Sequence, residues 1–154
     1  MDTHTVETIF IRQATENDVA AIDAIERSAV ASPWSRAAIS GALSDEHAMN
    51  LAAIAAAGEM RGYLLGTLVA DELSIQYAVT HPLFRRRRIG RRLVEAAMEQ
   101  ARKRGARNAY LEVRSKNLAA RGLYAALGFT RQAVRKKYYA DNEDDALVMV
   151  KRLY

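Results

Sequence analysis

The feature that most constrains the fold is the stretch 72–114, in which strand, helix and strand patterns follow one another. Glu72–Val79 (ELSIQYAV) has the composition of a strand. His81–Gly105 (HPLFRRRRIGRRLVEAAMEQARKRG) predicts a basic loop that leads directly into an amphipathic helix, because apolar residues recur at helical spacing from Ile89 onward. Asn108–Arg114 (NAYLEVR) then alternates as a strand. A strand–helix–strand crossover of this kind indicates a mixed α/β domain.

The rest of the chain supplies the other elements of that domain through the same two periodicities. Further strands are expected at Thr8–Ala14, Met49–Ala57, Arg61–Ala70, Thr130–Tyr139 and Ala146–Leu153. Further helices are expected from about Thr15 to Val30, from the N-cap Ser35 to Ser44, and from Leu118 to Leu127 with Gly128 as the C′ residue. We therefore expect a single α/β domain over residues 1–154, with a mixed sheet of about seven strands flanked by about four helices.

The composition favours a globular protein of the cytoplasm. Half of the 154 residues are hydrophobic and 27% are charged, which is ordinary for a folded domain. No apolar run approaches the ~20 residues that span a bilayer, and the first residues carry no signal-peptide pattern. The chain has no cysteine, which excludes disulfides and a thiol nucleophile. We expect neither a membrane partner nor secretion.

Positive charge is concentrated where the helix of the crossover begins. The net charge is +5, and five arginines gather there: Arg85, Arg86, Arg87, Arg88 and Arg91. The first turn of a helix has amides without an internal acceptor and is the positive end of the helix dipole. Gly90 is expected to let the backbone turn tightly at this point. The combination favours a phosphorylated ligand, although a solvated face or an RNA-binding surface would also be basic.

Three stretches resemble one known family. Pro33-Trp34-Ser35, LEVRSKNLAARGLYAALGF (Leu111–Phe129) and Arg135-Lys136-Lys137-Tyr138-Tyr139 resemble the RimI type of the GNAT superfamily, the ribosomal-protein-alanine N-acetyltransferases. The family's pyrophosphate loop, Q/R-x-x-G-x-G/A, falls on Arg85–Gly90, with Arg88 in place of the first glycine. The resemblance implies a GNAT fold with the sheet splayed at its middle, acetyl-CoA as co-substrate, and no metal.

The resemblance also implies roles for individual residues. Glu112 would be the general base and Tyr124 the general acid of acetyl transfer. Trp34, Tyr138 and Tyr139 would lie near the acceptor. The backbone of Tyr77, Ala78 and Val79 would hold the pantetheine arm, and the amides from Arg86 to Arg91 the pyrophosphate. The positions expected to contact the coenzyme are therefore Tyr77, Ala78, Val79, Arg86, Arg87, Arg88, Ile89, Gly90, Arg91 and Asn117.

Each of these residues also has an ordinary structural interpretation. A glutamate in a strand, such as Glu112, is more often a surface residue, and Tyr124 on an apolar helix face is more often part of the core. Asn117 would cap its helix on either interpretation. His4, His47 and His81 lie far apart without the spacing of metal ligands, so no metal site is expected.

The expected activity is acetylation of a protein N-terminus by direct attack within a ternary complex. A ribosomal protein is one candidate acceptor. An α-amine, with a pKa of about 8 against about 10.4 for lysine, is neutral roughly a few hundred times more often at neutral pH. Two alternatives stay open at this stage. One is acetylation of a small amine or a lysine side chain, and the other is a ribosome- or RNA-binding module that uses the arginine-rich face. The oligomeric state is not predicted.

Overall fold

The computed structural model describes residues 7–139 and 144–154. Seven strands and four α-helices occur in this part of the chain. The strands are β1 (Ile9–Gln13), β2 (Leu51–Ala55), β3 (Met60–Val69), β4 (Glu72–Thr80), β5 (Asn108–Arg114), β6 (Thr130–Arg135) and β7 (Ala146–Arg152), and the helices are α1 (Val19–Ala29), α2 (Arg36–Ser44), α3 (Ile89–Lys103) and α4 (Leu118–Ala126). Short 3₁₀ turns precede α1 and α3.

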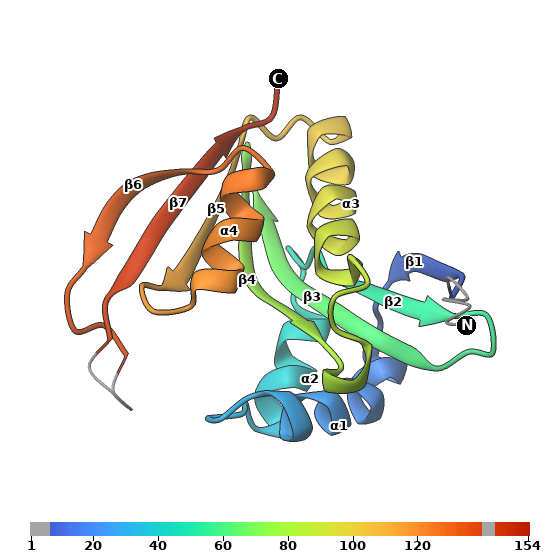
Figure 1. Ribbon diagram of the computed structural model, residues 1–154. Helices are drawn as coiled ribbons and strands as arrows, with labels where there is room; N and C mark the ends of the chain where they lie inside the picture. Colours follow the sequence, from blue (N-terminus) through green and yellow to red (C-terminus); the bar gives the residue numbers. More distant parts are fainter. Residues whose placement is uncertain (1–6, 140–143) are drawn as a thin grey trace, which may run out of the picture.

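The strands form one sheet in the order β1-β2-β3-β4-β5-β7-β6 (Figure 1). Only β4 and β5 run parallel, and every other pair of neighbours is antiparallel. The parallel pair is the one that α3 connects, as the strand–helix–strand pattern predicts. The expectation of a mixed α/β sheet flanked by four helices is therefore confirmed.

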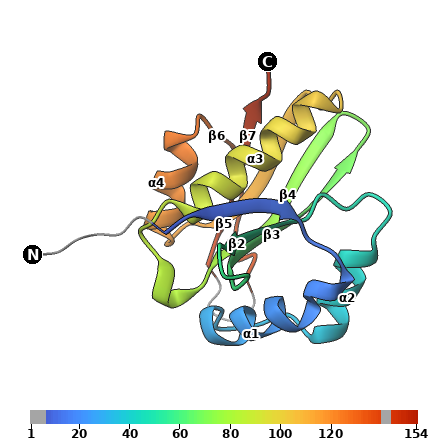
Figure 2. The ribbon, with the colours of Figure 1, turned by 90° about the vertical axis from the view of Figure 1, so that its right-hand side faces the viewer.

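Helices cover both faces of this sheet (Figure 2). On one face α1 and α2 bury a core that includes Ile22 and Ile39 against Tyr63 of β3. On the other face α3 and α4 bury a larger core, in which Leu93 and Tyr124 contact residues of the central strands. Because each face has its own core, the sheet separates two sides of the molecule.

The middle of the sheet is open because β4 and β5 pair over only part of their length. Glu72–Ile75 lies beside Asn108–Leu111, and the pairing then ends although β4 continues to Thr80. At this point β3 and β4 shift register, so that Leu65 faces Tyr77 while Gly66 faces Ile75 and Gln76 has no opposite residue. Such a bulge bends its strand, and here it directs β4 away from β5. The predicted splay is confirmed.

The sequence misplaced the end of β6. A strand to Tyr139 was expected, but β6 ends at Arg135. Lys137 has a left-handed backbone (φ +50°), and its amide donates to the Asp145 carboxylate at 2.9 Å. An alternating pattern cannot reveal a turn that is fixed by a partner eight residues away. The sequence also predicts an acidic turn from Asp141 to Asp145 between the last two strands, and most of it, residues 141–143, lies outside the described residues.

Other boundaries moved by a few residues. The strand expected at Met49–Ala57 is shorter, since β2 covers Leu51–Ala55. Three capping residues are confirmed: Ser35 accepts the Ala38 amide at 3.1 Å, Asn117 accepts the Ala120 amide at 3.1 Å, and Gly128 has a φ of +94° after α4. Within residues 7–139 and 144–154, no helix is long and apolar enough to cross a membrane.

We expect Gly66→Ala to destabilise the protein, because the bulge leaves no room for a side chain. A Cβ at Gly66 would lie 2.7 Å from the Ser74 carbonyl oxygen and 3.3 Å from that of Met49. Backbone atoms cannot move aside cheaply, so the free energy of unfolding should fall by ~2 kcal/mol. Gly41→Ala is the matched control, since nothing lies within 4 Å of its Cβ position and alanine favours α2 by ~0.5–1 kcal/mol. Urea denaturation that shows equal effects for both variants would contradict this account of the bulge.

Candidate active site

The gap in the sheet exposes one edge of β4. Beyond Ile75 this strand pairs with β3 alone, where Tyr77, Ala78 and Val79 face Leu65, Leu64 and Tyr63. At these three positions no strand of residues 7–139 and 144–154 therefore pairs with the side of β4 that faces β5. An extended ligand can pair with such an edge through backbone hydrogen bonds, as an added strand does. The three residues expected to hold the pantetheine arm thus line the gap.

The N-terminus of α3 lies next to the end of this edge. The first internal bond at this end of α3 is from the Arg92 amide to the Arg88 carbonyl, at 3.0 Å. The amides of Ile89, Gly90 and Arg91 precede it and have no acceptor inside the helix. A Cβ at Gly90 would lie 3.7 Å from both the Thr80 hydroxyl oxygen and a methyl carbon of Leu123. The end of β4, the start of α3 and the middle of α4 therefore meet at one place.

The tight turn before α3 is made by arginines rather than by Gly90. Arg86 and Arg88 have left-handed backbones, with φ of +65° and +62°, whereas Gly90 is not among the residues with positive φ. The expectation that Gly90 makes the turn was therefore wrong. Arg88 stands where the family has glycine, and the structure shows why glycine suits this position: its backbone is one that side chains disfavour by ~1 kcal/mol or more.

Some of the arginines at this loop form ion pairs with acidic side chains and others do not. Arg91 forms an ion pair with Glu95 at 2.8 Å, and Arg87 lies 3.6 Å from a Glu7 carboxylate oxygen. Arg85, Arg86 and Arg88 are exposed and form no ion pair within the described part of the chain. Exposed ion pairs contribute little, so the paired arginines can also turn toward a phosphate. Together with the helix end, they fit the diphosphate of acetyl-CoA.

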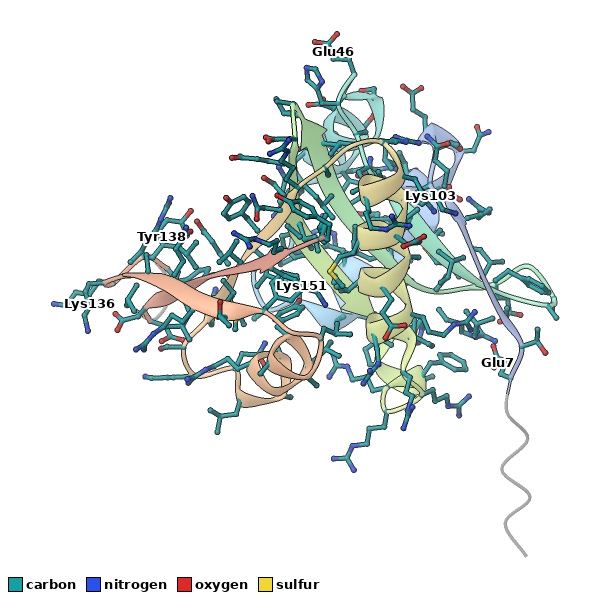
Figure 3. All side chains as sticks on the ribbon, turned by 90° about the horizontal axis from the view of Figure 1, so that it is seen from above. Glu7, Glu46, Lys103, Lys136, Tyr138 and Lys151 are labelled. Carbon is teal, nitrogen blue, oxygen red and sulfur yellow. The ribbon has the colours of Figure 1, made fainter. Side chains whose placement is uncertain are left out.

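A second feature, a cavity of about 620 Å³, lies at the gap beside β5 and is bounded by the loop before α2. Trp34, Tyr77, Glu112, Tyr138 and Tyr139 all line it, so the structure brings together five of the residues singled out from the sequence. The rings of Trp34 and Tyr77 meet edge to face, with centroids 4.8 Å apart. Tyr138 lies toward the outer end of the β6–β7 hairpin together with Lys136, on the opposite side of the molecule from Glu7 (Figure 3). Five of the thirteen residues that line the cavity are aromatic, and two more, Arg114 and Arg135, are basic.

Glu112 supplies the carboxylate of this cavity. It follows Leu111, the last residue of β5 that pairs with β4, and its side chain is 31% exposed. Its partner is the Arg135 guanidinium, which is itself mostly exposed and lies 3.3 Å away. Burial, and secondarily the negative charge of Glu112, raise the pKa of the Tyr139 hydroxyl above its ordinary value. Tyr139 therefore stays protonated beside the partly exposed carboxylate of Glu112.

Tyr124 lies on the other side of β5. Its side chain is 8% exposed and packs edge to face on Phe129, at 5.8 Å, in the core beneath α3 and α4. It does not line the cavity that contains Glu112. No residue in 7–139 or 144–154 forms a hydrogen bond with its hydroxyl, and burial raises its pKa. The hydroxyl is therefore a protonated donor that is not already committed to a protein acceptor.

One buried acid, Glu26 of α1, was missed from the sequence. It is 2% exposed, it accepts the Trp34 amide at 2.8 Å, and it also accepts the Tyr63 hydroxyl. A signal was present, since Glu26 falls four residues after Ile22, on the apolar stripe of its helix. In the described ranges, no three His, Cys, Asp or Glu side chains gather in a way that could hold a metal ion.

The described residues thus combine a free strand edge, a basic helix N-terminus and a cavity that contains one carboxylate and several aromatic rings. The profile described as the Acetyltransferase (GNAT) family matches residues 11–129, and the chain belongs to this family. It is 34% identical over 146 residues to the [ribosomal protein bS18]-alanine N-acetyltransferase of Salmonella typhimurium, which covers 94% of this chain and 96% of the relative. The protein of that name from Escherichia coli K12 is 32% identical over 134 residues, which cover 86% of this chain and 89% of the relative.

The fold agrees with these relatives. The crystal structure of the ribosomal-protein-S18-alanine N-acetyltransferase from Escherichia coli superposes with a TM-score of 0.89 at 30% identity, covering 95% of this chain and 94% of that one. The chain is therefore an N-acetyltransferase that uses acetyl-CoA. The enzyme class predicted from the sequence is confirmed, and it is favoured over the alternative of an RNA-binding module. The roles of individual residues stay predictions.

Replacement of Arg88 by glycine should stabilise the protein. Glycine adopts a φ of +62° without the cost that arginine bears, so we expect a gain of ~0.5–1 kcal/mol in the free energy of unfolding. Arg85→Gly is the matched control, because it removes the same charge from the same loop at an ordinary φ of −67°. That variant should lose ~0.5 kcal/mol through the added freedom of the unfolded chain. Urea denaturation in which both variants shift the same way would refute backbone strain at Arg88.

Proposed function

We propose that this enzyme acetylates the N-terminal α-amine of a protein that begins with a small residue such as alanine, with a ribosomal protein as the acceptor. The observation that most supports it is the cavity lined by Trp34, Glu112 and Tyr139, which places a carboxylate and aromatic walls at the open middle of the sheet. The curated relatives that cover most of the chain are named for the same reaction on bS18. An enzyme with such an acceptor would work in the cytoplasm.

The coenzyme would enter from the face of α3 and α4. The amides from Arg86 to Arg91 would hold its diphosphate, and the free edge of Tyr77, Ala78 and Val79 would pair with the pantetheine arm. Asn117 caps α4 and leaves its side-chain nitrogen for a further contact. Acetyl-CoA supplies the thioester to be attacked. Held in this way, the thioester would lie in the gap, between the face that bears Glu112 and the face that bears Tyr124.

The acceptor ammonium must lose two protons, and the leaving sulfur must gain one. The α-ammonium of the acceptor gives a proton to Glu112, directly or through a water, and the free amine attacks the thioester carbonyl carbon. As the C–N bond forms and the C–S bond breaks, the Tyr124 hydroxyl gives a proton to the leaving sulfur. The new amide nitrogen then loses its second proton through water to the Tyr124 oxygen, which restores the hydroxyl. No covalent enzyme intermediate is needed, in agreement with a chain that lacks cysteine. Holding both reactants at the gap supplies much of the acceleration.

The test is an acetylation assay on an alanine-starting peptide that also contains lysine. The product should be acetylated on the α-amine. Glu112→Gln and Tyr124→Phe should each lower kcat by about 10²-fold or more, because each removes one proton transfer, while the dissociation constant of acetyl-CoA changes less than about twofold. Glu99→Gln and Tyr154→Phe are the matched controls, since both side chains are exposed and far from the gap.

Two results would contradict the proposal in different ways. Acetylation confined to lysine would leave the enzyme class intact and refute the N-terminal acceptor, favouring a side-chain or small-amine substrate. Parent-like rates for both Glu112→Gln and Tyr124→Phe would instead refute the assigned proton transfers.

A further inference from the structure

The backbone of Trp34 is held from two sides by the last turns of α1. Its amide donates to the Glu26 carboxylate at 2.8 Å, and its carbonyl accepts from the Arg27 guanidinium. Trp34 lies in the short connection between Ala29, where α1 ends, and Arg36, where α2 begins. Neighbouring side chains of one helix thus satisfy both polar backbone groups of a single loop residue.

Burying the Glu26 carboxylate costs free energy of folding. It is 2% exposed, and a buried carboxylate is tolerated only when its oxygens are hydrogen-bonded. Its second oxygen accepts the hydroxyl of Tyr63, which is 0% exposed on β3. Burial and this bond raise the pKa of Tyr63, so the phenol stays a donor. An apolar residue would fill the same space without that cost, but it could not bind the Trp34 amide.

The position of Trp34 matters because its ring is a wall of the cavity. The indole packs edge to face on Tyr77, with centroids 4.8 Å apart, and both rings line the cavity that contains Glu112. In the part of the chain that the structure describes, this loop pairs with no strand, so a shift of its backbone would move the ring and change the width of the cavity. The contacts from Glu26 and Arg27 oppose that shift.

We propose that Glu26 and Arg27 are positioning residues of the acceptor cavity, which fix Trp34 so that its indole restricts the first acceptor residue to a small side chain. This inference rests on the proposed function, because it takes the cavity to hold the acceptor N-terminus. Neither residue touches the reacting atoms. Their effect is on which acceptor is bound and how tightly, and not on the proton transfers.

Trp34 is the only tryptophan in the chain, so its fluorescence reports on this loop directly. Acrylamide quenching of that fluorescence and steady-state kinetics should be measured together on the parent and four variants. Glu26→Leu removes the acceptor of the Trp34 amide, and Arg27→Met removes the donor to its carbonyl at an exposed site that does not endanger folding. Glu26→Gln keeps an oxygen for the amide and a nitrogen for the Tyr63 oxygen. Asp23→Asn is the control, because it breaks only the Asp23–Arg27 ion pair.

For Glu26→Leu we expect more quenching, a KM for an alanine-starting peptide that rises about tenfold, and a kcat within about threefold of the parent. The preference for alanine over leucine as first residue should fall, and the KM for acetyl-CoA should stay unchanged. For Arg27→Met we expect the quenching to increase as well, and the KM for the alanine-starting peptide to rise about threefold. Glu26→Gln and Asp23→Asn should resemble the parent.

Parent-like quenching and KM in folded Arg27→Met and Glu26→Leu would overturn the inference, as would a loss of kcat alone. If Glu26→Leu does not fold, Arg27→Met with its Asp23→Asn control decides. Failure of the proposed function gives a different result, since the parent itself would then not acetylate α-amines. In that case the fluorescence still tests whether Glu26 and Arg27 hold Trp34. More quenching in Glu26→Leu and Arg27→Met than in the parent would then show that these residues position Trp34 and that only the assignment of the acceptor is wrong.

Discussion

The active site depends on one interrupted interaction, the parallel pairing of β4 and β5. Four residues of each strand are paired, and the bulge at Gln76 then turns β4 aside. Had the ladder continued, the backbone of β4 would be saturated and the two faces of the sheet would be sealed from each other. Because it stops, one edge of β4 becomes free for a ligand beside the cavity that contains Glu112.

The positive charge at the start of α3 has a conformational cost. Arg86 and Arg88, in the loop before α3, both have left-handed backbones, and Arg88 is the position at which the resemblance has glycine. Arginine there gains a guanidinium next to the amides that lead into the helix, at the expense of backbone strain. Arg87 also lies 3.6 Å from a carboxylate oxygen of Glu7, just before β1, and over the ring of Phe84 in the same loop. The loop thus combines strain with several exposed cations.

Most of the elements, and one side of the site, could be predicted from periodicity and capping. The alternation of Asn108–Arg114 places Glu112 on the face opposite Leu111 and Val113, and the structure has it so. Asn117 and Gly128 mark the ends of α4 because their chemistry is local. The features that were missed or misplaced are not local: the end of β6 depends on Asp145, and the burial of Glu26 depends on Tyr63 of a distant strand. The family resemblance, and not the pattern of residues, indicated that Tyr124 and Glu112 act together.

We propose that the free edge of β4 and the N-terminus of α3 hold acetyl-CoA. Hydrogen–deuterium exchange of the backbone amides, with and without acetyl-CoA, tests it most directly. The account predicts slower exchange at Tyr77–Val79 and at Ile89–Arg91 when the coenzyme is bound, with no change along the exposed strand β6. Coenzyme binding that leaves both segments unprotected, or that protects β6 instead, would contradict it.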